Sequence, residues 1–126
     1  MSGARSGARC ETILVVEDDA AIRETLRDAL DLEGYKVEVA EHGGVALEKL
    51  KVLPRPCLIL LDLMMPVMNG LEFLEACRKD DTLVTIPVIM VTAFDTLARE
   101  AVGTAGIVKK PIDLDRLLEF VHEYCE

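Results

Sequence analysis

Residues 57–66 read CLILLDLMMP, an apolar run that reaches one acid, Asp62, and then continues with apolar residues up to a proline. A short run that is apolar on both faces is typical of a central strand in a parallel sheet. A carboxylate in such surroundings is costly to ionise unless neighbouring groups compensate its charge. The stretch therefore predicts a buried strand, and it predicts compensating groups close to Asp62.

Four further runs in the sequence have the composition of short strands. They are ILVV (13–16), KVEVA (36–40), PVIMV (87–91) and GIV (106–108). The apolar spacing is helical over residues 20–33, 44–53, 70–79 and 114–125, and residues 98–103 leave room for a helix of about two turns. This alternation predicts an α/β fold with a doubly wound, five-stranded parallel sheet and helices on both faces. KVEVA alternates polar and apolar residues, which favours an edge strand.

The ends of the helical patterns carry residues that suit helix ends. Asp19, Asn69 and Asp113 each precede a helical pattern and are predicted N-caps. Gly34 follows the first helical pattern and is a natural stop, because glycine adopts a left-handed backbone conformation at little cost. These residues predict where three helices begin and where one ends.

The composition fits one folded domain, since the chain has 126 residues of which 51% are hydrophobic. We expect residues 1–10, which repeat SGAR, to be a flexible tail and residues 11–126 to form the domain. The net charge of −9 argues against direct nucleic acid binding, which needs a basic surface. No membrane span or signal peptide is recognisable, and the four cysteines form no CxxC pair, so we expect a cytoplasmic protein.

Polar side chains follow the predicted central strands at the points where these strands end. They are Glu17, Asp18 and Asp19 after ILVV, Asp62 after CLILL, Thr92 after PVIMV, and Lys109 and Lys110 after GIV. Parallel strands carry their carboxyl ends at one edge of the sheet, where open α/β sheets bind ligands. The sequence therefore predicts that acids, a hydroxyl and a lysine converge at this edge.

The predicted acids suit a magnesium site. Carboxylates about 4–5 Å apart repel one another by about 4 kcal/mol per pair at an effective dielectric constant of about 20. Mg²⁺ relieves this repulsion best, because it accepts few protein carboxylates and keeps several waters. Glu17, Asp18 and Asp62 carry three negative charges, which Mg²⁺ and one lysine would balance. An aspartate can also act as a nucleophile toward phosphoryl groups, so the cluster suits phosphoryl transfer onto Asp62.

Four segments together resemble the response-regulator receiver domain family, which includes the chemotaxis receiver. They are VVEDD (15–19), LDLMMPVMNG (61–70), VTA (91–93) and KKP (109–111). The likeness covers residues 11–126, which is the whole chain apart from the tail. It implies the flavodoxin-like receiver fold with strand order 2-1-3-4-5, and a signalling domain that catalyses only its own phosphorylation and dephosphorylation.

The resemblance implies a role for each matching acid. Asp62 would be the phosphoacceptor, and Mg²⁺ would be held by Glu17, Asp18, Asp62 and the backbone carbonyl of Met64. The donor would be a sensor histidine kinase or a phosphotransfer protein. The phosphorylated domain would then switch its binding to an unknown output protein in two-component signal transduction, without a membrane or nucleic acid as partner.

The resemblance also implies roles for residues at the other strand ends. Thr92 would be the switch hydroxyl, and Lys110 would be the lysine that senses the phosphoryl group. The Lys110–Pro111 peptide bond would be cis. Ile107 stands where the family usually has an aromatic residue, which removes the usual aromatic readout. The segment from Thr92 to Lys110 is also shorter than in the chemotaxis receiver, so the output surface is expected to be unusual.

Three other functions compete with the receiver interpretation. Aspartate-based phosphohydrolases need a second acid two residues after the nucleophile, where this chain has Met64. A flavodoxin-like cofactor binder needs a phosphate loop after the first strand, where residues 17–19 are acidic and would repel a flavin phosphate. A pseudo-receiver that binds partners without phosphorylation stays as the main alternative, because Ile107 departs from the family pattern.

Overall fold

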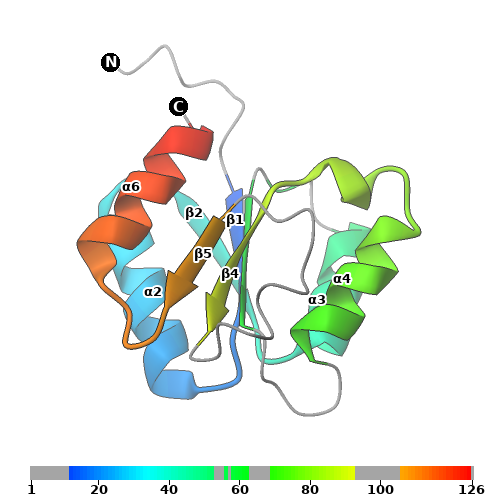
Figure 1. Cartoon of the computed structure of the whole chain (residues 1–126), viewed down its shortest axis with the longest axis horizontal. Helices are drawn as coiled ribbons and strands as arrows, with labels where there is room; N and C mark the ends of the chain where they lie inside the picture. The colour runs from blue at the N-terminus through cyan, green and yellow to red at the C-terminus, as the bar shows by residue number, and fades with distance from the viewer. Residues whose placement is uncertain (1–11, 53–55, 57, 63–68, 93–105, 126) are drawn as a thin grey trace.

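The computed structural model describes residues 12–52, 56, 58–62, 69–92 and 106–125. Within these ranges, five parallel strands form one sheet in the order β2-β1-β3-β4-β5 (Figure 1). The strands are β1 (Thr12–Val16), β2 (Lys36–Ala40), β3 (Leu58–Asp62), β4 (Val88–Thr92) and β5 (Gly106–Lys109). The predicted parallel sheet and its strand order are confirmed, and KVEVA is an edge strand as predicted.

Helices cover both faces of the sheet. They are α2 (Ala20–Leu32), α3 (Gly43–Val52), α4 (Gly70–Arg78) and α6 (Leu114–Cys125), with a short 3-10 helix η1 (Leu83–Thr85) that the sequence did not predict. Figure 1 shows α2 and α6 on one side of the sheet and α3 and α4 on the other. The four α-helices agree with the predicted patterns to within one residue at each end. The helix expected over 98–103 lies outside the described residues.

The central strands send alternate side chains into two separate cores. Leu14 and Leu61 lie in the core beneath α3 and α4, whereas Val15 and Leu60 lie in the core beneath α2 and α6. Alternation along a strand places successive side chains on opposite faces, so a sheet covered on both sides needs unbroken apolar runs. Each such large side chain contributes about 1.5–3 kcal/mol through burial. These two cores fix the strand ends on which the site is built.

Three strands end one residue beyond their predicted apolar runs, and one of them is β5, which ends at Lys109. Asp62 and Thr92 are the last residues of β3 and β4, whereas the sequence predicted them just after the strands. Backbone pairing does not depend on side-chain polarity, so the ladder continues through a polar residue until the chain turns away. In register, Asp62 lies beside Val91 and Thr92 lies beside Lys109. The sheet therefore fixes the backbone of both polar residues, and their side chains are buried.

The predicted helix ends are also confirmed. The Asp19 side chain accepts a backbone amide of the first turn of α2, and Asp113 does the same at the start of α6. Asn69 and Glu72 form a reciprocal capping box on α4. Gly34 follows α2 with a φ of 95°, a conformation that favours glycine over residues with a side chain.

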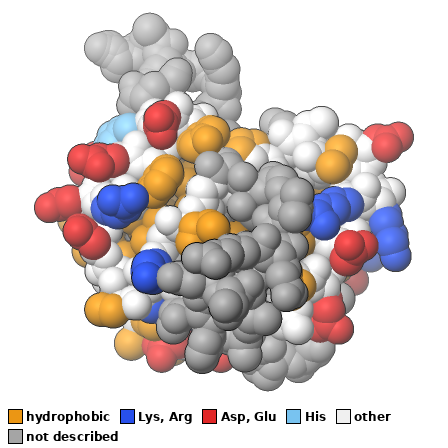
Figure 2. All heavy atoms as spheres, viewed as in Figure 1, with side chains coloured by type: hydrophobic (Ala, Val, Ile, Leu, Met, Phe, Trp, Pro, Cys, Tyr) orange, Lys and Arg blue, Asp and Glu red, His pale blue; other side chains and the backbone are white. Residues whose placement is uncertain are grey.

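The surface of the described residues mixes both signs of charge. Figure 2 shows Lys and Arg side chains standing apart among acidic ones on the described part of this face, without a gathered basic patch. None of the helices that the structure describes is both long enough and apolar enough to cross a membrane. The predicted tail over residues 1–10 lies outside the described ranges.

Candidate functional site

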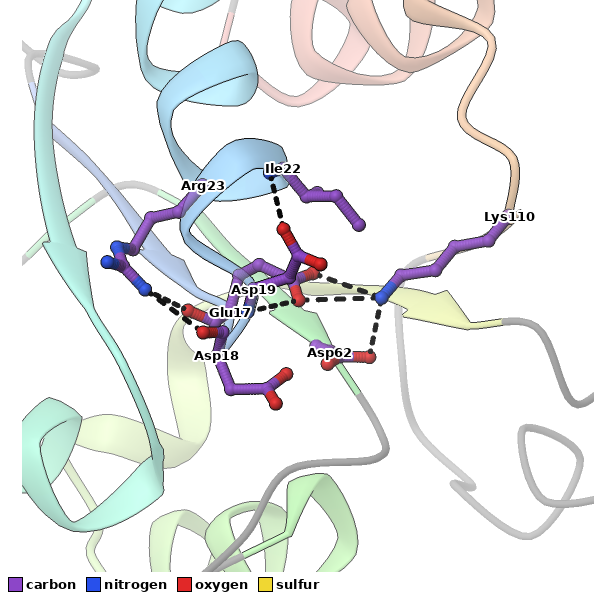
Figure 3. A network of polar contacts seen from close by, with 7 residues as sticks. All are labelled: Glu17, Asp18, Asp19, Ile22, Arg23, Asp62 and Lys110. Atoms are coloured by element: carbon purple, nitrogen blue, oxygen red, sulfur yellow. Dashed lines mark hydrogen bonds and ion pairs between the residues drawn. The ribbon is translucent and has the colours of Figure 1, made fainter.

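Three carboxylates gather at the carboxyl edge of the sheet. Glu17 and Asp18 directly follow β1, and Asp62 ends the adjacent strand β3. One oxygen from each of the three lies within 4.8 Å of the others. Figure 3 shows the side chains of Glu17 and Asp18 on one side of this edge and that of Asp62 on the other. The predicted convergence of the acids is present in the structure.

The Glu17 carboxylate is buried, with only 1% of the residue exposed. Its backbone amide continues the sheet pairing by donating to the carbonyl of Ala40 at 3.0 Å. Its side-chain oxygen Oε2 accepts the backbone amide of Asp19 at 3.1 Å. This second bond folds the carboxylate back over its own loop, so that it points toward Asp62 and not into solvent.

Lys110 connects the two buried acids. Its Nζ atom lies 3.2 Å from Glu17 Oε1 and 3.3 Å from Asp62 Oδ1, as the dashed lines in Figure 3 show. Lys110 directly follows β5, and its backbone amide donates to the carbonyl of Thr92 at 2.9 Å. The Lys110–Pro111 peptide bond is cis, as the resemblance implied. One ammonium group therefore compensates the two buried carboxylates, with 20% of its side chain exposed.

The surroundings shift the proton affinity of both partners. Burial and then the negative charge of Glu17 raise the pKa of Asp62 from 3.8 to about 7, although Lys110 opposes the shift. Burial by itself lowers the pKa of Lys110, but the carboxylates of Glu17 and Asp62 together raise it above the ordinary lysine value. Lys110 thus keeps its charge, while Asp62 is hard to ionise as long as no further positive charge is near.

The donor set fits a hard divalent cation. The three clustered residues offer only carboxylate oxygens, which are the ligands that Mg²⁺ prefers. Glu17 Oε1 is buried and accepts no aligned hydrogen bond from the described residues, although the Lys110 ammonium lies 3.2 Å away. A divalent cation here would add positive charge to the single ammonium that the two buried carboxylates share. The cluster is an acidic group that could hold a metal ion.

The remaining candidate residues lie at different places relative to the acidic cluster, and one lies outside the described residues. Thr92 is fully buried at the end of β4, beside the strand that carries Asp62. Met64, whose carbonyl was an expected metal ligand, lies outside the described residues. Asp19 caps α2, which is how we interpreted it from the sequence. Ile107 lies in β5 with 36% of the residue exposed.

One residue of this site was missed by sequence reasoning. Arg23, in the first turn of α2, donates from its guanidinium to the backbone carbonyls of Glu17 and Asp18 at 3.0 Å and 3.3 Å. The signal that could have identified it is a basic residue four positions after the predicted cap Asp19, because that spacing returns a long side chain to the start of a helix.

Comparisons with known proteins agree with this architecture. The family model described as the response regulator receiver domain matches residues 13–122. The response regulator MprA of Mycolicibacterium vanbaalenii is 41% identical over 112 residues, which cover 84% of this chain and 46% of that protein. The chain thus spans about half the length of the curated relatives that it matches.

Two solved structures are similar over nearly the whole fold. A response regulator receiver protein from Pseudomonas putida has a TM-score of 0.85 and 29% identity, and the match covers 93% of this chain and 99% of that one. The response regulator TrrA from Thermotoga maritima has a TM-score of 0.81 and 33% identity, with 90% and 98% covered. The matched family model, the fold and the acidic cluster lead to one conclusion: the chain belongs to the response regulator receiver domain family, whose members are signalling phosphoacceptors and not enzymes in their own right.

Proposed function

We propose that this chain is a phosphorylation-dependent receiver in which Asp62 accepts a phosphoryl group and the change in charge switches the binding of an output protein. The observation that carries the proposal is the position of Lys110, whose ammonium contacts both Asp62 and Glu17 within 3.3 Å. A structural surface acid needs no such partner, whereas a nucleophile whose product carries added negative charge needs a cation in place. Receiver domains generally take part in signalling with histidine kinases. The donor proposed for this chain is accordingly a sensor histidine kinase or a phosphotransfer protein.

The chemistry assigns a separate task to each side chain. An ionised Asp62 oxygen attacks the phosphorus atom of the donor, a new P–O bond forms, and the bond between phosphorus and the donor atom breaks. Lys110 lies where it can stabilise negative charge on the transferring oxygens. Thr92, at the end of the neighbouring strand, would donate a hydrogen bond from its hydroxyl to one of those oxygens. These tasks require Asp62 to be ionised, although its pKa is raised in the cation-free site.

The residues that would hold Mg²⁺ are Glu17, Asp18, Asp62 and the backbone carbonyl of Met64. When bound, the ion would supply positive charge next to the phosphoryl oxygens and would favour the ionised form of Asp62. The TrrA structure supports this choice of metal, because that related receiver is in complex with Mg²⁺-BeF. Mg²⁺ usually keeps several waters, which the oxygens of a phosphoryl donor can replace.

Phosphorylation would change the forces on the end of β5. It replaces one negative charge on Asp62 by about two, which strengthens the attraction for Lys110. Lys110 follows β5 directly, and Ile107 lies in that strand with 36% of the residue exposed. We propose that this edge of the sheet contributes to the surface that an output protein reads. Receiver domains are typically cytoplasmic, and we propose the same location for this chain.

The test is phosphorylation by a small-molecule donor. The full chain is incubated with acetyl phosphate and Mg²⁺, and its intact mass is measured. We expect one phosphoryl group on the wild type, none on Asp62→Asn, and one on the matched control Asp28→Asn, whose carboxylate is exposed on α2. A wild-type chain that stays unmodified while folded would refute the proposal and favour the pseudo-receiver alternative. A stable adduct on Asp62→Asn would show that the acceptor is another residue.

A further inference from the structure

We infer that Arg23 is a positioning residue for the metal site, because its guanidinium holds the two backbone carbonyls of the acidic pair Glu17 and Asp18. The inference deepens the proposed function and rests on it. Arg23 contacts neither the Asp62 carboxylate nor the Lys110 ammonium in Figure 3, and acts only through the backbone that carries the two acids.

The geometry of Arg23 joins the helix to the acidic loop. A single nitrogen, Nη1, donates to the carbonyl of Glu17 at 3.0 Å and to the carbonyl of Asp18 at 3.3 Å. The Arg23 backbone amide donates to the carbonyl of Asp19 at 2.9 Å, which anchors the residue in the first turn of α2. Figure 3 shows the side chain reaching from this turn to the outer side of the loop, away from Asp62.

These carbonyls lie between two regular elements. The pairing of β1 with β2 reaches Val16 and continues through the backbone amide of Glu17, and α2 begins at Ala20. The carbonyls of Glu17 and Asp18 therefore belong neither to the sheet ladder nor to the helix. The bond to the Glu17 carbonyl is half-buried, where a carbonyl needs a donor, and the guanidinium supplies it.

The orientation of this loop matters for the metal because two of the three clustered acids come from it. Rotation of the peptide planes at Glu17 and Asp18 would swing both side chains, and Mg²⁺ demands near-ideal octahedral geometry. Mutation of a group that hydrogen-bonds to the residues carrying metal ligands typically lowers metal affinity by about 10–100-fold. The positive guanidinium also repels an incoming cation, so its removal would by charge alone strengthen Mg²⁺ binding, which is opposite to the loss expected from mispositioned acids.

The experiment measures Mg²⁺ binding to the unphosphorylated full chain by calorimetry, so that no protein partner is involved. The variants are Arg23→Ala, Arg23→Lys and the matched control Arg27→Ala. Arg27 lies one turn further along α2, is half exposed, and its guanidinium lies 3.9 Å from Glu24. Removing it changes the net charge by the same amount without touching the loop. Urea unfolding without Mg²⁺ and the carbonyl-carbon NMR shifts of Glu17 and Asp18 are recorded for each chain.

We expect Arg23→Ala to weaken Mg²⁺ binding by about tenfold and to shift both carbonyl signals. Arg27→Ala should leave the affinity and the signals close to those of the wild type. Arg23→Lys keeps the charge but offers a single ammonium in place of a planar fork, so its affinity should fall between the two. If Arg23→Ala does not fold, Arg23→Lys decides the matter by binding Mg²⁺ measurably more weakly than the wild type.

Other results overturn the inference. Equal Mg²⁺ affinity in wild type and folded Arg23→Ala would refute it and leave the proposed function intact, as would an unchanged Arg23→Lys where Arg23→Ala is unfolded. An equal loss in Arg27→Ala would show that the loss does not depend on the contacts between Arg23 and the loop, and it would also overturn the inference. A wild-type chain that binds no Mg²⁺ would refute the proposed metal site together with this inference, so the two failures are distinguishable.

Discussion

At the scale of the residue, the protonation state of Asp62 is sensitive to a small change in the charge around it. Burial and the carboxylate of Glu17 disfavour its ionised form, and Lys110 favours it. The balance raises the pKa to about 7, which lies near physiological pH. Because this buried carboxyl group is ion-paired with Lys110 and has a pKa near physiological pH, a nearby cation can change its protonation state.

Asp62→Asn is expected to stabilise the Mg²⁺-free fold, by an amount that grows with pH. The folded-state pKa of Asp62 is raised from 3.8 to about 7, so the folded protein binds this proton more tightly than the unfolded chain does. The stability that this proton contributes is fully present below about pH 4 and is lost as pH rises through about 7. The advantage of the asparagine variant over the wild type should therefore grow between about pH 4 and pH 7 and then level off.

Urea unfolding at a series of pH values, with a chelator present, measures this difference. The control is Asp28→Asn, which removes an exposed carboxylate from α2. A stability difference between Asp62→Asn and wild type that does not vary with pH would contradict the raised pKa.

At the scale of the element, the site depends on where strands stop and helices start. The alternation of apolar runs and helical patterns predicted the four α-helices to within one residue, because burial of one helix face leaves a clear period in the sequence. The ends of β3, β4 and β5 were predicted one residue too early, since hydrophobicity marks burial and not backbone pairing. The error includes the two strands that carry Asp62 and Thr92.

The capping box of α4 provides a test at this scale. Asn69 accepts the Glu72 backbone amide, and the Glu72 side chain accepts the Asn69 amide, both at 2.9 Å. We expect Asn69→Ala to lower the free energy of unfolding by about 1 kcal/mol, because it leaves a helix amide without its acceptor. Asn69→Asp keeps an acceptor at the cap and should cost much less. Urea unfolding measures both, and an equal loss in the two variants would mean that capping is not the cause.

At the scale of the whole molecule, the sequence predicted one set of long-range contacts and missed another. The convergence of acids and lysine was predictable, because parallel strands deliver their ends to one edge. The contacts of His122 were not: its ring lies 3.0 Å from Glu33 Oε1 and 3.3 Å from the Tyr35 hydroxyl, and so connects α6 to the end of α2. Contacts between residues about ninety positions apart leave no local period, and only the fold brings them together.

Mg²⁺ is expected to stabilise the whole domain, since a ligand that binds only the folded state shifts the unfolding equilibrium. The gain is RT ln(1 + [Mg²⁺]/Kd), about 2.7 kcal/mol at one hundred times the dissociation constant. Thermal unfolding should therefore shift upward by several degrees in saturating Mg²⁺ relative to NaCl of equal ionic strength. Asp18→Ala should lose most of this shift, because it removes one of the three clustered carboxylates, whereas Asp28→Ala should keep it. Asp18 is exposed, so its loss has little effect on the core, and the two variants should unfold at similar temperatures without Mg²⁺. An equal Mg²⁺-induced shift in Asp18→Ala and wild type would exclude Asp18 as a metal ligand.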